Sequence, residues 1–186
     1  MTGPADPRCG FIALLGAPNA GKSTLINALV GSKVAIVSPK VQTTRTRVLG
    51  IVVEGDSQLV FVDTPGIFEP RRRLDRAMVA AAWAGAQDAD IAVLLVDATQ
   101  GRVGAESWSI VDGLAKTGRR SMLLLNKIDV APRPKLLEMS AALNERGRFE
   151  ATFMISALSG DGLDDLRRSL AAAVPKGPWL FPEDQL

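Results

Sequence analysis

Six short apolar runs recur along this chain, and stretches with helical spacing separate most of them. The runs cover residues 11–15, 48–53, 59–62, 91–96, 122–125 and 152–155, and the expected helices cover 22–30, 74–86, 105–116, 134–146 and 163–173. Runs that are apolar throughout are typical of parallel strands buried on both faces. Alternation of this kind predicts an α/β fold of three layers, with a six-stranded, mostly parallel sheet flanked by about five helices. Glu54-Gly55-Asp56 lies between two β-branched runs and predicts a hairpin there.

The loop after the first run fits the pattern G-x-x-x-x-G-K-[ST]. Its residues are Gly16, Ala17, Pro18, Asn19, Ala20, Gly21, Lys22 and Ser23, and we include Thr24 in the predicted contact set. The loop follows a predicted strand and opens a predicted helix, which is the context that the pattern requires. The glycines let successive N–H groups point at phosphate oxygens, and the helix adds its N-terminal dipole. We expect Lys22 to reach the β- and γ-phosphates and the Ser23 hydroxyl to be a ligand of Mg²⁺.

The segment Asp63-Thr64-Pro65-Gly66 ends the third apolar run. In a phosphate-loop fold, a carboxylate at this place lies near Mg²⁺ and contacts it through water. The Gly66 amide can bond a γ-phosphate, so the segment after it can sense whether that phosphate is present. We therefore predict Asp63 as part of the metal site and residues 63–66 as part of the nucleotide site.

The segment Asn126-Lys127-Ile128-Asp129 ends the fifth run and points to guanine. Guanine presents two adjacent donors, and a carboxylate is the side chain that accepts both. We predict that Asp129 binds this edge, that Asn126 contacts the O6/N7 side, and that the stem of Lys127 covers the ring. A backbone N–H of Ser156-Ala157-Leu158, at the end of the last run, is expected near guanine O6.

These four segments occur in the order found in Ras-like GTPase domains, and the resemblance covers nearly the whole chain. Three strings resemble the Era branch of these GTPases: Gln42-Thr43-Thr44-Arg45, Asp63 to Ile67, and Phe181 to Gln185. The resemblance implies a GTPase domain over residues 1–174, with 175–186 a linker toward a C-terminal KH domain absent from this chain. It also implies a role in assembly of the small ribosomal subunit. The KH domain would bind small-subunit ribosomal RNA and the pre-30S particle.

The resemblance implies slow GTP hydrolysis, with catalytic contributions from Lys22, Asn19, Thr44 and Gly66. By family analogy, Thr44 is the expected switch I ligand of Mg²⁺. Ile67 stands where many Ras-like domains have a water-orienting glutamine. Related loops use an asparagine to hold K⁺, which gives Asn19 that role here; the alternative is that its amide only stabilises the loop.

The amino-acid composition excludes some kinds of chemistry and favours some kinds of partner. The chain of 186 residues has no histidine and one cysteine, Cys9, which excludes histidine catalysis and an internal disulfide and favours the cytoplasm. No acidic residue occurs between Pro7 and Val53. A segment without negative charge favours binding of a polyanion, and a chance distribution of charges is the alternative explanation. We expect a monomer that binds a guanine nucleotide. Peripheral association with a membrane is a further alternative. The alternatives are a GTP/GDP-sensing module without hydrolysis, an ATPase and a self-sufficient RNA-binding protein.

Overall fold

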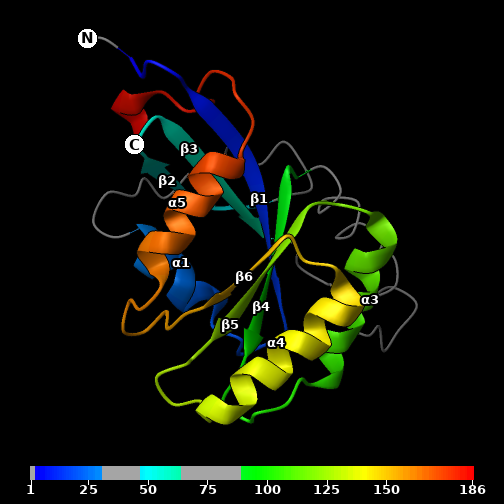
Figure 1. Cartoon of the computed structure of the whole chain (residues 1–186). Coiled ribbons are helices and arrows are strands. Elements are labelled where there is room, and N and C mark those ends of the chain that lie inside the picture. Colours follow the sequence, from blue (N-terminus) through cyan, green and yellow to red (C-terminus); the bar gives the residue numbers. More distant parts are fainter. Residues whose placement is uncertain (1–2, 31–46, 64–88) are drawn as a thin grey trace.

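One six-stranded sheet organises this protein in a computed structural model that describes residues 3–30, 47–63 and 89–186. The strands are β1 (Arg8–Gly16), β2 (Arg47–Glu54), β3 (Ser57–Asp63), β4 (Ile91–Asp97), β5 (Ser121–Asn126) and β6 (Ala151–Met154). The helices are α1 (Lys22–Val30), α3 (Ala105–Thr117), α4 (Arg133–Gly147), α5 (Leu163–Ala173) and the short 3₁₀-helix η3 (Glu183–Gln185). Figure 1 shows their arrangement.

The sheet order is β2-β3-β1-β4-β5-β6. All neighbouring strands are parallel except β2 and β3, which form an antiparallel hairpin. Gly55 has a φ of +57° in the turn of that hairpin, a conformation that glycine adopts without strain. The predicted mostly parallel, six-stranded sheet and its hairpin are therefore confirmed.

Successive residues of the central strands pack on opposite faces of the sheet, which gives two hydrophobic cores. In β1, Ala13 and Leu15 belong to one core with residues of α3 and α4, whereas Ile12 and Leu14 belong to the other with residues of α1 and α5. Figure 1 shows the same division, with α1 and α5 on one side of the sheet and α3 and α4 on the other. Burial of both faces explains why these strands are apolar throughout.

Four of the five predicted helices lie within the described residues, with ends within a few residues of those expected. The fifth, predicted at 74–86, lies outside the described residues. Gly118 follows α3 with a φ of +64°, and Gly162 precedes α5 with a φ of +79°. Left-handed glycines at these positions turn the chain away from each helix. Across residues 3–30, 47–63 and 89–186, no helix is both long and apolar enough to cross a membrane.

The C-terminal segment, residues 175–186, lies against the β2–β3 hairpin. Gln58 of β3 is fully buried, and its Oε1 accepts from the N–H groups of Leu180 (3.0 Å) and Phe181 (3.1 Å). Its Nε2 donates to the Phe181 carbonyl at 2.9 Å, and Trp179 Nε1 donates to the Asp56 carbonyl at 2.9 Å. Phe181 also packs against the hydrophobic core, whereas Leu180 is 55% exposed.

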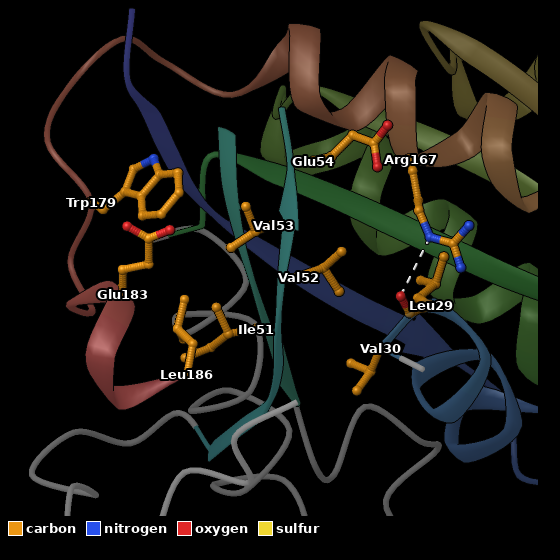
Figure 2. A pocket seen from close by; sticks show the side chains of 10 residues that line it. All are labelled: Leu29, Val30, Ile51, Val52, Val53, Glu54, Arg167, Trp179, Glu183 and Leu186. Atoms are coloured by element: carbon orange, nitrogen blue, oxygen red, sulfur yellow. Dashed lines mark hydrogen bonds between the residues drawn. The ribbon is translucent and has the colours of Figure 1, made fainter. Parts of the chain in front are cut away.

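A cavity of about 600 Å³ lies beside β2, the edge strand, between the C-terminal segment and the helices α1 and α5. Figure 2 shows Trp179 and Leu186 on one side of it and Arg167 of α5 on the other. Arg167 Nε donates to the Leu29 carbonyl at 3.3 Å, and Arg167 Nη2 donates to the Ala28 carbonyl at 2.9 Å. The guanidinium thus bonds terminal carbonyls of α1, which has no basic residue in its own last turn.

Candidate nucleotide-binding site

The predicted site residues gather at one edge of the sheet. Gly16, Asp63, Asp97 and Asn126 are the last residues of β1, β3, β4 and β5, which run parallel to one another. Ligands of doubly wound sheets bind at this edge, outside the carboxyl ends of the strands. Segments that lie far apart in the sequence are thereby brought to one place.

The phosphate loop is a tight turn that leads directly into α1. The Ala20 N–H donates to the Ala17 carbonyl at 3.1 Å, and the Leu25 N–H donates to the Gly21 carbonyl at 2.9 Å. Asn19 has a φ of +68°, which is uncommon for a residue other than glycine and is held by the surrounding turn. The loop therefore presents the N-terminal end of α1 as an anion site.

The two glycines of the loop are required for different reasons. A Cβ at Gly16 would lie 2.9 Å from the Leu95 carbonyl oxygen of the neighbouring strand. Gly21 has a φ of +103°, and a Cβ there would lie 2.5 Å from Asn126 Nδ2. One glycine therefore lets the loop leave the sheet, and the other lets the loop approach the predicted guanine-binding segment.

Asn126 joins three of the predicted segments. Its side chain is 2% exposed; Nδ2 donates to the Ala20 carbonyl at 2.9 Å, and Oδ1 accepts from the Ala157 N–H at 3.0 Å. A buried amide with both ends bonded to backbone fixes the loops against one another. The sequence predicts only a guanine contact for this residue. The structure shows in addition that it joins the loops.

Lys127 makes a further connection through a residue that the sequence reasoning missed. Its ammonium donates to the Asn19 carbonyl at 2.9 Å and to Asp97 Oδ2 at 2.8 Å. Asp97 Oδ1 accepts from the backbone N–H and the hydroxyl of Thr99. Partial burial acts to raise the pKa of Asp97, but the bonds from Lys127 and Thr99 outweigh it and hold that pKa below its ordinary value.

The segments predicted to hold guanine are also in contact. Ser156 is fully buried, and its hydroxyl donates to Asp129 Oδ1 at 2.9 Å. The Ile128 N–H donates to the Ile155 carbonyl at 3.2 Å, which connects the two loops through backbone. Asp129 is exposed, and Leu158 is 82% exposed at the rim. The contact with Ser156 fixes the orientation of the Asp129 carboxylate while the residue stays exposed.

Three of the predicted phosphate and metal residues line one cavity of about 200 Å³: Lys22, Ser23 and Asp63. Among the described residues, no group of three His, Cys, Asp or Glu side chains could hold a metal ion. One hydroxyl and one carboxylate are hard oxygen donors, and Mg²⁺ commonly takes one or two such protein ligands and completes its shell with phosphate and water. The donor set therefore fits Mg²⁺ bound together with a phosphate ligand. Four other predicted site residues lie outside the described residues: Thr44, Thr64, Pro65 and Gly66.

A model of the family described as "50S ribosome-binding GTPase" matches residues 11–127, from the first strand through the Asn126-Lys127 pair. The chain belongs to this GTPase family. The matched region includes the phosphate loop, Asp63 and the start of the predicted guanine segment.

Named relatives agree with the Era-type resemblance. The chain is 60% identical over 186 residues to GTPase Era of Bradyrhizobium sp. (strain ORS 278), covering all of this chain and 60% of the relative. It is 54% identical over 184 residues to GTPase Era of Rhizobium meliloti, covering 99% of this chain and 58% of the relative. The chain thus spans about 60% of the length of these curated relatives. The prediction of an Era-type GTPase domain is confirmed.

Two solved structures agree with the fold. A variant of Aquifex aeolicus Era bound to GDP and AlF₄⁻ has a TM-score of 0.76 and 36% identity, with 95% of this chain and 60% of that chain covered. Era in complex with MgGDPNP and nucleotides 1506–1542 of 16S ribosomal RNA has the same TM-score and identity, with coverage of 96% and 61%. The G domain of the FeoB iron transporter from T. maritima, at 22% identity and a TM-score of 0.65, shows the fold alone; it covers 89% of this chain and 98% of that chain.

Proposed function

We propose that this chain binds a guanine nucleotide together with Mg²⁺ and hydrolyses GTP, and that it acts as a switch. The observation that carries the proposal is the Asn126 amide, which bonds both the phosphate loop and the Ala157 segment. This bonding sets the phosphate end and the base end of the proposed site at a fixed separation before any ligand arrives. The relatives solved with GDP and AlF₄⁻ and with MgGDPNP support the same ligand class.

In the proposed complex, the triphosphate lies on the amides of residues 16–24 and against the Lys22 ammonium. Asp129 accepts from guanine N1–H and its amino group, Asn126 bonds the O6/N7 side, and the stem of Lys127 covers the ring. A backbone N–H of residues 156–158 faces O6. The contact from Ser156 supports the Asp129 role, because it orients the carboxylate while Asp129 stays exposed to a ligand.

Ser23 and Asp63 would hold Mg²⁺, with Thr44 as the third protein group. Mg²⁺ would neutralise charge on the β- and γ-phosphates when bound. The shared cavity of Lys22, Ser23 and Asp63 supports this assignment.

Hydrolysis is proposed to occur by in-line attack of water on the γ-phosphorus. Lys22, the loop amides and the Gly66 N–H would stabilise the charge that develops on the phosphate oxygens. Because Ile67 replaces the usual glutamine, intrinsic turnover is expected to be slow and to rise with a partner. Asn19, at an exposed turn, is the proposed K⁺ contact. GTP turnover that is equal in K⁺ and Na⁺ buffers of matched ionic strength would remove Asn19 from that role.

A single-turnover measurement of phosphate release separates a GTPase from a GTP/GDP-sensing module. We expect one phosphate per bound GTP, and no release when Lys22 is replaced by alanine. The Lys22→Ala control reports on contaminating phosphatase, because that substitution removes the cation of the phosphate loop. Binding of GTP without release by the parent chain would favour the sensing module.

The relatives also support a proposal about the role of the whole protein. We propose that the GTPase domain is residues 1–174, that 175–186 connects it to an RNA-binding KH domain, and that the whole protein acts in small-subunit assembly. The relative solved with 16S ribosomal RNA supports this role. We also propose a monomer in the cytoplasm, the location resting on the single cysteine.

A further inference from the structure

We propose that Asp97 is a positioning residue, which holds the Lys127 ammonium against the phosphate loop and thereby slows nucleotide release. This inference rests on the proposed function, because it assigns a task within the same nucleotide site. No predicted segment includes Asp97, and its role follows from the contacts alone.

The contacts form a continuous chain across the site. Thr99 bonds one oxygen of the Asp97 carboxylate through its N–H at 2.8 Å and its hydroxyl at 2.7 Å. The other carboxylate oxygen accepts from Lys127 Nζ at 2.8 Å, and that nitrogen also donates to the Asn19 carbonyl at 2.9 Å. Both carboxylate oxygens are thus engaged, which leaves the ammonium little freedom to turn away.

The strand register keeps Asp97 beside the guanine segment. Asp97 pairs with Asn126 across β4 and β5, and the Ala98 N–H donates to the Asn126 carbonyl at 3.1 Å. A carboxylate at the end of β4 therefore lies next to the residue that precedes Lys127. The parallel ladder between β4 and β5 sets this placement.

Both ends of the Lys127–Asn19 contact have unusual backbone conformations. Lys127 has a φ of +67° and Asn19 has a φ of +68°. Residues other than glycine adopt this left-handed region at a cost and keep it where their surroundings hold them. The Lys127 ammonium bonds the carbonyl of the other strained residue, so Asp97 stabilises the conformation of both loops through a single side chain.

Burial distinguishes this ion pair from the others. The side chains of Lys127 and Asp97 are 35% and 34% exposed. Every other ion pair between described residues has at least one side chain that is more than half exposed. Exposed pairs contribute little because water and salt screen them, whereas a pair in which both side chains are partly buried keeps more of its strength.

The test measures the dissociation rate of a fluorescent GDP from the 186-residue chain, chased with excess GDP in Mg²⁺ buffer. We expect Asp97→Ala to raise the rate about tenfold and Asp97→Asn, which keeps the shape and one acceptor, about threefold. The matched control is Asp112→Ala, which removes the same charge from the Arg146 pair between α3 and α4. That control is expected to leave the rate unchanged.

A double-mutant cycle then shows whether Asp97 acts through the ammonium. Lys127→Met keeps a long apolar side chain and removes the charge. On that background, we expect Asp97→Ala to change the rate by less than about twofold. A purely structural role through Thr99 predicts instead the same fold-change on both backgrounds, which would overturn the inference.

The proposed function and the role of Asp97 can be tested separately. If the parent chain binds no GDP, the proposed function and this inference both fall. If the parent chain binds GDP and releases it at the same rate as Asp97→Ala and Asp97→Asn, only the assignment of Asp97 is wrong. The isosteric Asp97→Asn variant keeps the test valid if Asp97→Ala does not fold.

Discussion

Replacing Gly21 with alanine tests the close approach between the phosphate loop and the guanine segment. The new Cβ would lie 2.5 Å from Asn126 Nδ2, closer than such atoms approach one another in proteins. Asn126 cannot move away freely, because it is 2% exposed and bonded to the Ala20 carbonyl and the Ala157 N–H. The substitution therefore has to strain the loop and displace a buried amide.

The expected cost has two parts. A φ of +103° strains alanine by about 1–3 kcal/mol. Loss of the two bonds of Asn126 adds about 1 kcal/mol each. The sum of about 3–5 kcal/mol is smaller than the unfolding free energy of a typical domain, roughly 5–15 kcal/mol, so the variant should fold but unfold at a lower urea concentration.

Two further variants separate the cost of backbone strain from the cost of losing the Asn126 bonds. Gly160 has a φ of +90° and open space where a Cβ would lie, so Gly160→Ala should cost only the backbone strain. On an Asn126→Ala background the two Asn126 bonds are already absent. Gly21→Ala should therefore lower the unfolding free energy by about 2 kcal/mol less there than in the parent chain. Equal destabilisation by Gly21→Ala and Gly160→Ala, with full additivity to Asn126→Ala, would show that the contact between Gly21 and Asn126 does not constrain the loop.

Three other outcomes follow. Gln58→Leu should lower the unfolding free energy by about 2–3 kcal/mol and expose residues 175–186 to protease, because three backbone partners lose their buried amide; unchanged cleavage would contradict this. Asp129→Asn should shift binding from GDP toward XDP in a competition titration, since the amide cannot accept from both guanine donors. The folded pKa of Asp97 is below its ordinary value of 3.8, so its ionised form stabilises the fold above that pH. The difference in unfolding free energy between the parent and Asp97→Asn should then shrink as the pH falls below 3.8. A difference that grows as the pH falls would contradict this prediction.

The sequence predicted the strands well because buried parallel strands are apolar on both faces. Their ends were less predictable. β3 begins with Ser57 and Gln58, two buried polar residues that do not extend an apolar run. Their side-chain partners lie far away in the sequence, at Ala171 for Ser57 and at Cys9, Leu180 and Phe181 for Gln58, so nothing local indicates that they belong to the strand.

The candidate site was predicted as a set of segments, and the connections between those segments were not. The patterns place Gly21, Asn126 and Lys127 in the site, but the bonds from Asn126 and Lys127 to the phosphate loop depend on the packed sheet. Asp97 had one available signal. It ends an apolar run at the same sheet edge as Asp63 and Asn126, and a systematic reading of strand ends would have included it.

In the proposed complex, the edge of the sheet holds a guanine nucleotide between the phosphate loop and Asp129. Isothermal titration of the 186-residue chain with GDP and with ADP, in Mg²⁺ buffer, tests it most directly. We predict binding of one GDP per chain and no measurable heat with ADP. Equal affinity for the two nucleotides, or no heat with GDP, would contradict it.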